Sequence, residues 1–502
     1  MERIAIIDVG SNSVRLVMID IGPEGGYHQI ENVKETVRLV ANTAPDGSLH
    51  PKAQEHAVET LALFAGLCEV RGVDTIIAVA TAAVRRAPNR AEFLAKLHRE
   101  TGIEVRVLTG EEEADLDYIG VVNTVAPETG LIIDVGGGST KLIGYRNRLK
   151  EHWAALPFGS VTLANDFAVR DKIDPASLVE LEGFLTKELT KLPWLFQYNT
   201  VVALGGIART LARIDRRRRD YRPDISHGYE ILAESVEDNY RRLARLDLHS
   251  RWRIAGMSRE RADVIVAGIA VIKQVLQASG SSRVVTSRSG LRDGLLYRYL
   301  SRDTRDPILL SPLMHSVENL IQYYNIESAH YRHVNNLALS LYDQLRPLHG
   351  MNTYERRLLI VAALLHDIGI VVDHENRYIH TFYMMLNARL NGLSHRELVT
   401  CAFVAASHER YFLQGVMNYT VPAGPLEQED FRRIMLLSLL LRLAKSFDLG
   451  KGGAVEGVRV EIDDHEVRMR LRTRGKARLE MQAAMAHAAD FKAFFRRSLR
   501  II

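Results

Sequence analysis

The chain contains 502 residues, of which 47% are hydrophobic and 25% are charged. This length is too great for one hydrophobic core and predicts about three or four domains. The net charge of +4 excludes a strongly basic chain, so we expect no specific nucleic-acid partner. No apolar run is long enough to span a bilayer, and no leader precedes the first predicted strand, so we expect no membrane partner. Cys68 and Cys401 lie in apolar helical stretches, which predicts reduced core thiols and a cytoplasmic location.

A repeated α/β pattern occupies the first three hundred residues. Three strands are predicted within 1–40, followed by a helix over 52–70, a strand over 74–80, a helix over 91–100, a strand over 103–108 and a helix over 111–122. After Gly130 the order begins again, with strands near 131–135, 140–146 and 150–157, a helix near 175–192, a strand over 200–204, helices near 206–213 and 261–278, a strand over 284–287 and a helix from 291. Repetition of so large a unit predicts two α/β lobes with a cleft between them.

The remaining part of the chain has a different pattern. Residues 306–447 are predicted to be helical, and Gly450–Gly453 to be a flexible break. A hairpin over 458–462 and 467–471 follows, and then a final helix over about 481–498. Four arginines alternate with other residues near the hairpin: Arg468, Arg470, Arg472 and Arg474. They would share one face of a strand, either as a solvated edge protected by charge or as a track for a long polyanion.

Two short segments are near copies of each other. Asp8–Ser13 and Asp134–Ser139 each follow an apolar strand and lead into a second one. Glycines let the backbone approach a ligand closely, and successive N–H groups form a concavity for anions. Two such turns from duplicated halves predict a clamp on a phosphate. Asp8 and Asp134 end strands at the cleft, where they would either hold Mg²⁺ or bond to local N–H groups.

Other segments add polar groups to the same frame. Gly205–Thr210 forms a third glycine turn before a helix, where an anion is favoured, and Arg85 would bind phosphate in a bidentate manner. Glu111, Glu112 and Glu113 begin a helix, and each alone is explained by the helix dipole. Their place at the lobe boundary also suits a glutamate that orients and deprotonates water.

A separate cluster of histidines and aspartates lies in the helical part. It consists of His330, His366, Asp367 and Asp448, with His380 and His408 in neighbouring stretches. Imidazoles and carboxylates from several helices would bind a divalent metal, whereas a single His-Asp pair is explained by helix capping.

Several motifs together resemble the exopolyphosphatase/guanosine pentaphosphate phosphatase family over essentially the whole chain. They are Asp8–Ser13, Ala80–Arg85, Gly110–Ala114, Asp134–Ser139, Gly205–Thr210, Glu260–Ile265 and Gly290–Gly294. The resemblance implies an α/β fold of two ribonuclease-H-like lobes, as in the actin/Hsp70/sugar-kinase superfamily. It divides the chain into lobe I (1–125), lobe II (126–305), an all-α HD-like domain (306–450) and a small α+β domain (451–502).

The resemblance also implies roles for particular residues. Glu113 would be the catalytic base and Asp134 a ligand of Mg²⁺ or another divalent cation. Asp8 is a further candidate for this metal, and the His330 cluster for a second one. The residues expected to hold phosphates are Asn12, Ser13, Arg85, Gly136, Gly137, Gly138, Ser139, Lys141, Gly205, Gly206 and Arg261. Activation by a monovalent cation and a homodimer are further expectations.

Lys141 departs from the family pattern. Many members follow the second turn with Ser-Thr-Glu, whose glutamate is associated with the metal, whereas this chain has Ser139-Thr140-Lys141. The change amounts to two charge units. Three outcomes are open: Lys141 contacts phosphate, the metal binds more weakly, or the side chain points into solvent.

The leading hypothesis is a processive exopolyphosphatase that cleaves the terminal phosphate of inorganic polyphosphate by in-line attack of water. The alternative of the same chemistry is a guanosine pentaphosphate phosphatase, because both substrates end in a phosphoanhydride-linked phosphate. A non-catalytic regulator that binds polyphosphate or guanosine penta- or tetraphosphate is the third hypothesis. An ATP-dependent kinase of the same superfamily is the fourth.

Overall fold

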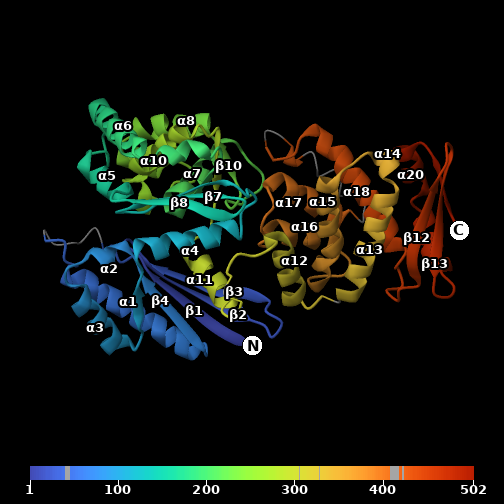
Figure 1. Ribbon diagram of the computed structural model, residues 1–502, viewed down its shortest axis with the longest axis horizontal. Coiled ribbons are helices and arrows are strands. Elements are labelled where there is room, and N and C mark those ends of the chain that lie inside the picture. The colour runs from blue at the N-terminus through green and yellow to red at the C-terminus, as the bar shows by residue number, and fades with distance from the viewer. Residues whose placement is uncertain (40–45, 305, 327, 408–417, 421–422) are drawn as a thin grey trace. The chain divides into compact units, whose positions relative to one another are not determined.

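The computed structural model describes residues 1–39, 46–304, 306–326, 328–407, 418–420 and 423–502 (Figure 1). Contacts group the chain into two compact units. Unit 1 comprises Met1–Arg219 with Ser226–Pro312, and unit 2 comprises Asp220–Ile225 with Leu313–Ile502. This grouping does not test the finer four-domain boundaries, which stay a prediction. Within the described ranges, no helix has both the length and the apolar character needed to cross a membrane.

Unit 1 contains a first mixed sheet of five strands in the order β3-β2-β1-β4-β5. The strands are β1 (Glu2–Val9), β2 (Val14–Ile21), β3 (Tyr27–Glu35), β4 (Thr75–Ala80) and β5 (Val105–Val107). β1 pairs antiparallel with β2 and parallel with β4, and β4 pairs parallel with β5. The chain order of strands and helices is the one predicted for the first lobe, except that a short helix, α2 (Ala82–Arg86), follows β4.

A second sheet repeats this topology in the order β10-β11-β9-β6-β7-β8. Its strands are β6 (Gly130–Val135), β7 (Thr140–Arg146), β8 (Leu149–Leu156), β9 (Val201–Leu204), β10 (Glu230–Leu232) and β11 (Arg283–Thr286). β6 takes the place of β1, because it pairs antiparallel with β7 and parallel with β9. β10, which the sequence did not predict, adds an antiparallel edge. Unit 1 therefore has the expected α/β character, with a duplicated sheet.

The central strands are continuous apolar runs. Ile4, Ile6 and Ile7 of β1 and Ile132 and Ile133 of β6 are all inaccessible to solvent. A strand without polar alternation requires cover on both faces, which helices supply in α/β folds. The carboxyl end of each such strand carries its aspartate to the edge of the sheet, where the polar turn begins.

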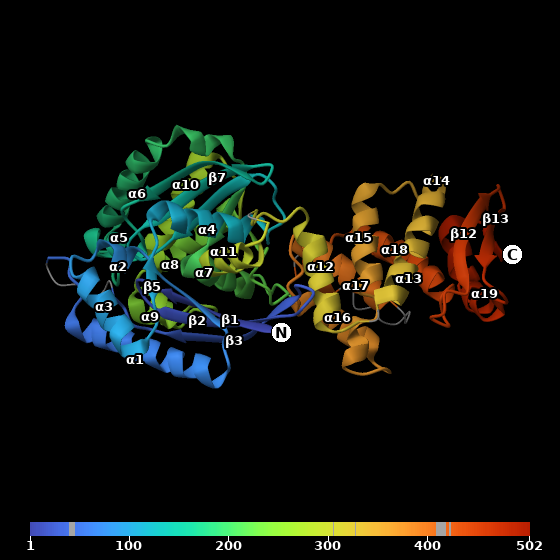
Figure 2. The same ribbon diagram turned by 60° about the horizontal axis from the view of Figure 1, so that its bottom comes forward.

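Helix α4 (Gly110–Val122) lies between the two sheets (Figures 1 and 2). Leu116 packs in one apolar cluster with β1, whereas Ala114 and Val121 pack in another with β6 and β7. α11 (Leu291–Leu300) lies beside α4 at very short range, since a methyl group at Gly294 would fall 2.0 Å from the Leu116 carbonyl oxygen. α4 is thus held on both faces and carries its polar side chains to a fixed place.

Unit 1 contains further helices. They are α1 (Pro51–Val70), α2 (Ala82–Arg86), α3 (Arg90–Thr101), α5 (Ser160–Asp166), α6 (Pro175–Thr190), α7 (Gly205–Arg218), α8 (Ala233–Ala244), α9 (Leu248–Trp252) and α10 (Ile265–Ser279), with 3₁₀ turns η1 (Pro193–Gln197) and η2 (Arg259–Arg261).

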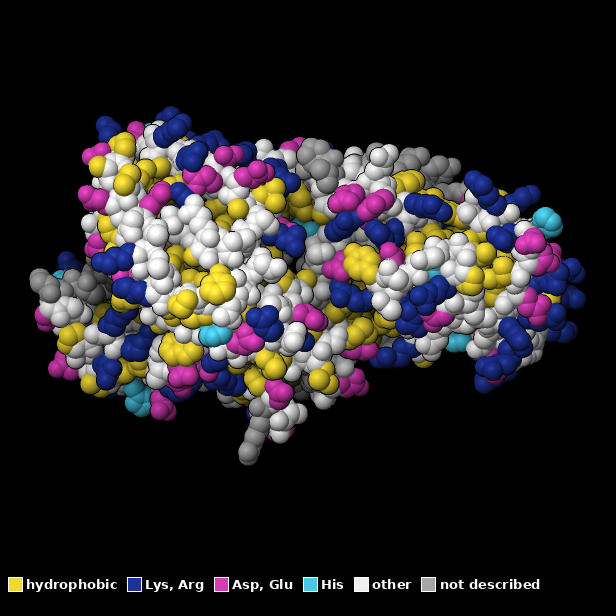
Figure 3. Space-filling model, turned by 45° about the horizontal axis from the view of Figure 1, so that its top comes forward, with side chains coloured by type: hydrophobic (Ala, Val, Ile, Leu, Met, Phe, Trp, Pro, Cys, Tyr) yellow, Lys and Arg dark blue, Asp and Glu magenta, His cyan; other side chains and the backbone are white. Residues whose placement is uncertain are grey.

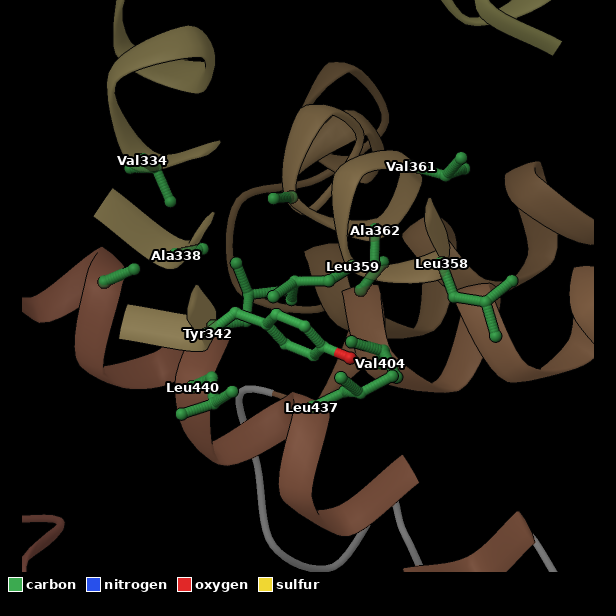
Figure 4. Packing of buried hydrophobic residues seen from close by; sticks show 14 of the residues in the cluster. Val334, Ala338, Tyr342, Leu358, Leu359, Val361, Ala362, Val404, Leu437 and Leu440 are labelled. Carbon is green, nitrogen blue, oxygen red and sulfur yellow. The ribbon is translucent and has the colours of Figure 1, made fainter. Parts of the chain in front are cut away.

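Unit 2 is mainly helical, as its sequence pattern predicts. Its helices are α12 (Pro312–Tyr323), α13 (Ser328–Gln344), α14 (Arg346–His349), α15 (Thr353–Leu364), α16 (Arg377–Asn387), α17 (His395–Ala406), α18 (Gln428–Ser446), α19 (Arg478–Met485) and α20 (Ala488–Phe495), with the 3₁₀ turn η3 (Ile368–Val371). Tyr342 packs among Leu359, Val404 and Leu437 in its core (Figure 4). Val467 of the tail belongs to the same cluster, so residues 451–502 share this core.

The tail forms a three-stranded sheet in the order β12-β13-β14. The predicted hairpin is present as β12 (Val455–Ile462) and β13 (Glu466–Thr473). The predicted single helix over 481–498 is wrong, because two short helices are followed by β14 (Ser498–Ile501). β14 pairs parallel with β13, and its buried residues Leu499 and Ile501 alternate with more polar ones, as expected of a strand.

β13 is therefore a central strand, and the prediction of an edge strand is wrong. Its arginines do share an exposed face, and each is paired with a carboxylate. Arg470 Nε lies 2.8 Å from Glu461 Oε1, and Glu456 lies near both Arg472 and Arg474. Basic and acidic side chains are also interspersed over the face of the molecule that Figure 3 shows. The exposed face of β13 is consequently less basic than its arginines alone suggest.

Candidate active site in unit 1

A polar cavity of about 310 Å³ lies where the carboxyl ends of β1 and β6 meet helix α4. Most of the predicted site residues line it: Asp8, Asn12, Ser13, Glu113, Asp134, Gly136, Gly137, Ser139, Lys141, Gly205, Gly206 and Arg261. Gly138 and Arg85 are not among the lining residues. The Gly138 carbonyl accepts a hydrogen bond from Arg86 at 3.1 Å, which links α2 to the second copied turn.

The two copied turns have the same local geometry. The Gly10 N–H donates to the Ser13 carbonyl at 3.1 Å, and the Gly136 N–H donates to the Ser139 carbonyl at 2.9 Å. A methyl group at Gly137 would lie 3.9 Å from Cβ of Ser11, so the turns approach each other across the cavity. This arrangement brings the two copied turns together around one ligand-sized cavity.

The third glycine turn, Gly205–Thr210, leaves space for two different side chains. Gly205 has a φ of +88°, and a methyl group there would fall 2.8 Å from Asp134 Oδ1. A methyl group at Gly206 would fall 1.9 Å from Cζ of Arg261, so only glycine leaves room for that guanidinium. The turn thus admits both a carboxylate and an arginine to the start of α7.

The three glutamates of α4 have different environments. Glu112 closes a capping box, accepting from the Thr109 N–H at 2.8 Å, and Glu111 is exposed. Glu113 is buried and faces the cavity, where Arg85 Nη1 donates to Oε2 at 3.1 Å. The helix-terminus explanation therefore accounts for Glu111 and Glu112, whereas Glu113 belongs to the site.

Lys141 lies at the centre of a carboxylate cluster. Its ammonium is 2.9 Å from Glu113 Oε1 and 2.9 Å from Asp134 Oδ2, and it also donates to Asp117 Oδ2. Burial by itself lowers the pKa of Lys141, but the three carboxylates outweigh it and raise that pKa well above its usual value. The lysine is thus held as a cation, and the expectation that it points into solvent is wrong.

Asp117 is a site residue that the sequence reasoning missed. It follows Glu113 by one helical turn, which places both carboxylates on the same face of α4. Burial raises the pKa of Asp117 to about 7, with Lys141 opposing the shift. The spacing of four residues between Glu113 and Asp117 was the sequence signal that could have found Asp117. Only the register of β7 brings Lys141 to both carboxylates.

A group of arginines also lines the cavity. It comprises Arg15, Arg38, Arg170, Arg209, Arg261, Arg288 and Arg292. Burial lowers the pKa of Arg209 to about 10, and the neighbouring arginines Arg15, Arg261, Arg292 and Arg288 lower it as well. Burial raises the pKa of Asp8, although Arg292 and Arg15 oppose this shift. Of these arginines, only Arg261 was assigned from sequence. So many cations around one cavity suit a ligand with several negative charges.

The residues at Asp134 do not fit a divalent cation in this arrangement. Within the described part of the chain, no group of three or more His, Cys, Asp and Glu side chains could hold a metal ion. The ammonium of Lys141 lies where an ion shared by Glu113 and Asp134 would have to be. Magnesium at Asp134 or Asp8 therefore stays a prediction that this geometry does not favour.

The second predicted metal cluster lies in unit 2, and its four residues come together. His330 Nδ1 is 2.7 Å from Asp448 Oδ2, and the His330 and His366 rings are 5.6 Å apart. Lys445 Nζ donates to Asp367 Oδ2 at 2.7 Å, so a cation already neutralises that carboxylate. His380 is partly exposed on α16, and His408 lies outside the described residues. The second metal site and the HD-like character of this region stay predictions.

Comparisons with known proteins cover most of the chain. The model of the Ppx/GppA phosphatase family matches residues 7–303, and that of Ppx/GppA phosphatase, domain III, matches residues 314–484. A protein from Aeromonas salmonicida (strain A449), named guanosine-5'-triphosphate,3'-diphosphate pyrophosphatase, is 27% identical over 453 residues, covering 88% of each chain.

Solved structures are similar to about 60% of the chain. The Ppx/GppA family member from Aquifex aeolicus is 30% identical with a TM-score of 0.54, and the match covers 60% of this chain and 99% of that one. An exopolyphosphatase from Cytophaga hutchinsonii is 26% identical with a TM-score of 0.56, covering 61% of this chain and 100% of that one. The resemblance seen in the sequence motifs is confirmed: the chain belongs to the Ppx/GppA phosphatase family.

Proposed function

We propose that this chain is an exopolyphosphatase, which releases orthophosphate from the end of inorganic polyphosphate. The observation that supports it most is the cavity in which the copied turns and the arginine group surround Glu113. A terminal phosphate carries its charge on several oxygens, and arginines and backbone N–H groups are the donors that recognise such oxygens. The name of the similar Cytophaga hutchinsonii protein agrees with this substrate class.

The reaction is a hydrolysis with a simple balance of atoms. The oxygen of water forms a bond to the terminal phosphorus, and the bridging P–O bond breaks with its electron pair leaving on the shortened chain. Glu113 orients the water and accepts its proton. Because the transition state of phosphoryl transfer demands positioning and charge stabilisation, the arginine group would supply most of the rate enhancement.

A second candidate substrate is guanosine pentaphosphate. The relative from Aeromonas salmonicida carries the name of that activity and matches over most of both chains. The same cavity would take the terminal phosphate of this nucleotide, so the two substrates share the chemistry and differ in what lies beyond it.

The purified full-length chain should release orthophosphate from long polyphosphate, and Glu113→Gln should slow that release by about a hundredfold or more. Glu111→Gln is the matched control, because Glu111 is exposed on the same helical turn. Measuring kcat/KM for polyphosphate and for guanosine pentaphosphate decides between the substrates. Tight binding of either without turnover would instead support a non-catalytic regulator.

A further inference from the structure

The ammonium of Lys141 is enclosed by carboxylates from two different elements. Glu113 and Asp117 come from α4, and Asp134 comes from β6. Only 4% of the Lys141 side chain is exposed to solvent, and the Asp117 side chain is similarly buried at 3%. A lysine so placed cannot exchange its partners for water without leaving buried carboxylates uncompensated.

Strand register fixes the lysine in this place. Lys141 of β7 lies directly opposite Asp134 of β6 in the antiparallel ladder, so both side chains project from the same face of the sheet. Thr140 and Leu142, its neighbours in β7, are inaccessible to solvent, which holds the strand. The ammonium therefore reaches Glu113 and Asp117 because of the sheet, and not through a chance side-chain conformation.

The Lys141 ammonium and a divalent ion are alternative occupants of the position between Glu113 and Asp134, because both are cations. Replacing glutamate by lysine changes the local charge by two units, which is the charge of one divalent cation. A Mg²⁺ ion would require oxygen ligands at about 2.0–2.1 Å, and an ion bridging Glu113 and Asp134 would coincide with the ammonium. Two such cations side by side in a buried site repel each other strongly.

We propose that the Lys141 ammonium takes the place of the divalent cation that a glutamate here would help to hold, so that this chain needs no protein-bound divalent metal for hydrolysis. Lys141 is a positioning residue in this scheme, because it fixes the carboxylate of Glu113 and balances the charge of Asp134. The arginine group carries the charge of the substrate. The inference rests on the proposed function for its rate measurement only, since metal binding is measured without substrate.

The first experiment uses the full-length wild-type chain. Mn²⁺ is titrated into the protein without substrate, and bound ion is followed by electron paramagnetic resonance. Orthophosphate release from polyphosphate is then compared in excess EDTA and in Mg²⁺. We expect no tight Mn²⁺ site in unit 1 and a rate that persists in EDTA. Polyphosphate itself binds Mg²⁺, so EDTA also changes the substrate. The ratio of the rate in EDTA to the rate in Mg²⁺ is therefore compared between the wild type and the variants.

The second experiment changes the charge at this place. Lys141→Glu should create a Mn²⁺ site that binds at least about tenfold more tightly than wild type, and its activity should become sensitive to EDTA. Lys141→Gln keeps the side-chain length without the charge and should show an intermediate affinity, so it replaces the glutamate variant if that one fails to fold. Lys150→Gln is the matched control, because Lys150 of β8 pairs with Asp115 of α4 outside the cavity.

The outcomes separate the two proposals. Tight Mn²⁺ binding by the wild type that Asp134→Asn abolishes and Lys141→Glu does not strengthen, or a wild-type rate that EDTA lowers as much as it lowers the rate of Lys141→Glu, would overturn the inference while leaving the hydrolase intact. Absence of orthophosphate release under every metal condition would overturn the proposed function, and the Mn²⁺ titration would still decide the role of Lys141.

Discussion

Arg85 holds the carboxylate of Glu113: its Nη1 atom donates to Oε2 at 3.1 Å and to the Leu108 carbonyl at 2.7 Å. The guanidinium is thereby fixed to the end of the strand before α4. Direct binding of phosphate by Arg85, which the sequence predicts, is still a prediction. The contact with Glu113 indicates that this arginine also positions that carboxylate.

Arg85→Ala should lower kcat for orthophosphate release by about a hundredfold, because a loosened Glu113 no longer holds water in line. KM should change much less, as should the melting temperature. Arg106→Ala is the control, because Arg106 pairs with the capping Glu112 at the exposed side of the same helix. An equal loss in both variants would show that the effect arises from the helix and not from the site.

Gly206→Ala should raise KM by about tenfold, because the added methyl group displaces Arg261 and charge-assisted hydrogen bonds to the substrate are lost. Steady-state kinetics with a short polyphosphate measures this. The same substitution at Gly183, an exposed residue of α6 with open space around it, should leave KM unchanged and stabilise the fold by about 0.5–1 kcal/mol. A KM unaffected by Gly206→Ala would remove Arg261 from substrate binding.

The Arg3–Asp20 pair predicts a pH-dependent contribution to stability. Arg3 Nε lies 2.6 Å from Asp20 Oδ1, and this hydrogen bond lowers the pKa of Asp20. The stabilisation is present above the pKa of an unfolded aspartate, about 3.9, and is lost as the pH falls through the lowered folded value. Asp20→Asn should therefore lower the melting temperature at pH 7, and the difference should shrink towards pH 3. A difference that stays constant with pH would rule out this electrostatic origin.

The two thiols should be unreactive in the folded protein. Burial raises the pKa of Cys68 to about 11 and also raises the pKa of Cys401. At pH 8 only about one in a thousand Cys68 side chains would be the reactive thiolate. Ellman's reagent should therefore react slowly with the native chain and quickly with two thiols in guanidinium chloride. Rapid reaction of the native chain would contradict the packing around these residues.

Removing Arg470 and Arg472 together should weaken polyphosphate binding little and equally for short and long chains. Both are exposed and paired with glutamates of β12, whose carboxylates offset the positive charge that a polyanion would meet. Fluorescence anisotropy with chains of different length measures this. Weakening that grows with chain length would instead support the polyanion track.

Sequence patterns alone predict the repeated α/β order, the copied turns and a place for Glu113 near them. These features are local: an apolar run forms a strand, glycine allows the turn, and a duplicated unit forms a duplicated sheet. The same local reasoning failed at β14, because Ser498–Ile501 becomes a strand only through pairing with β13.

The surroundings of Glu113 depend on how distant segments of the chain pack together. Lys141 was open to three outcomes in the sequence, and the register of β7 against β6 placed its ammonium among carboxylates of α4 and β6. Asp117 and most of the arginine group also come to the cavity from segments that are distant in the chain. Burial and charge act through space, so the partners of an ionised side chain follow from packing and not from its neighbours in sequence.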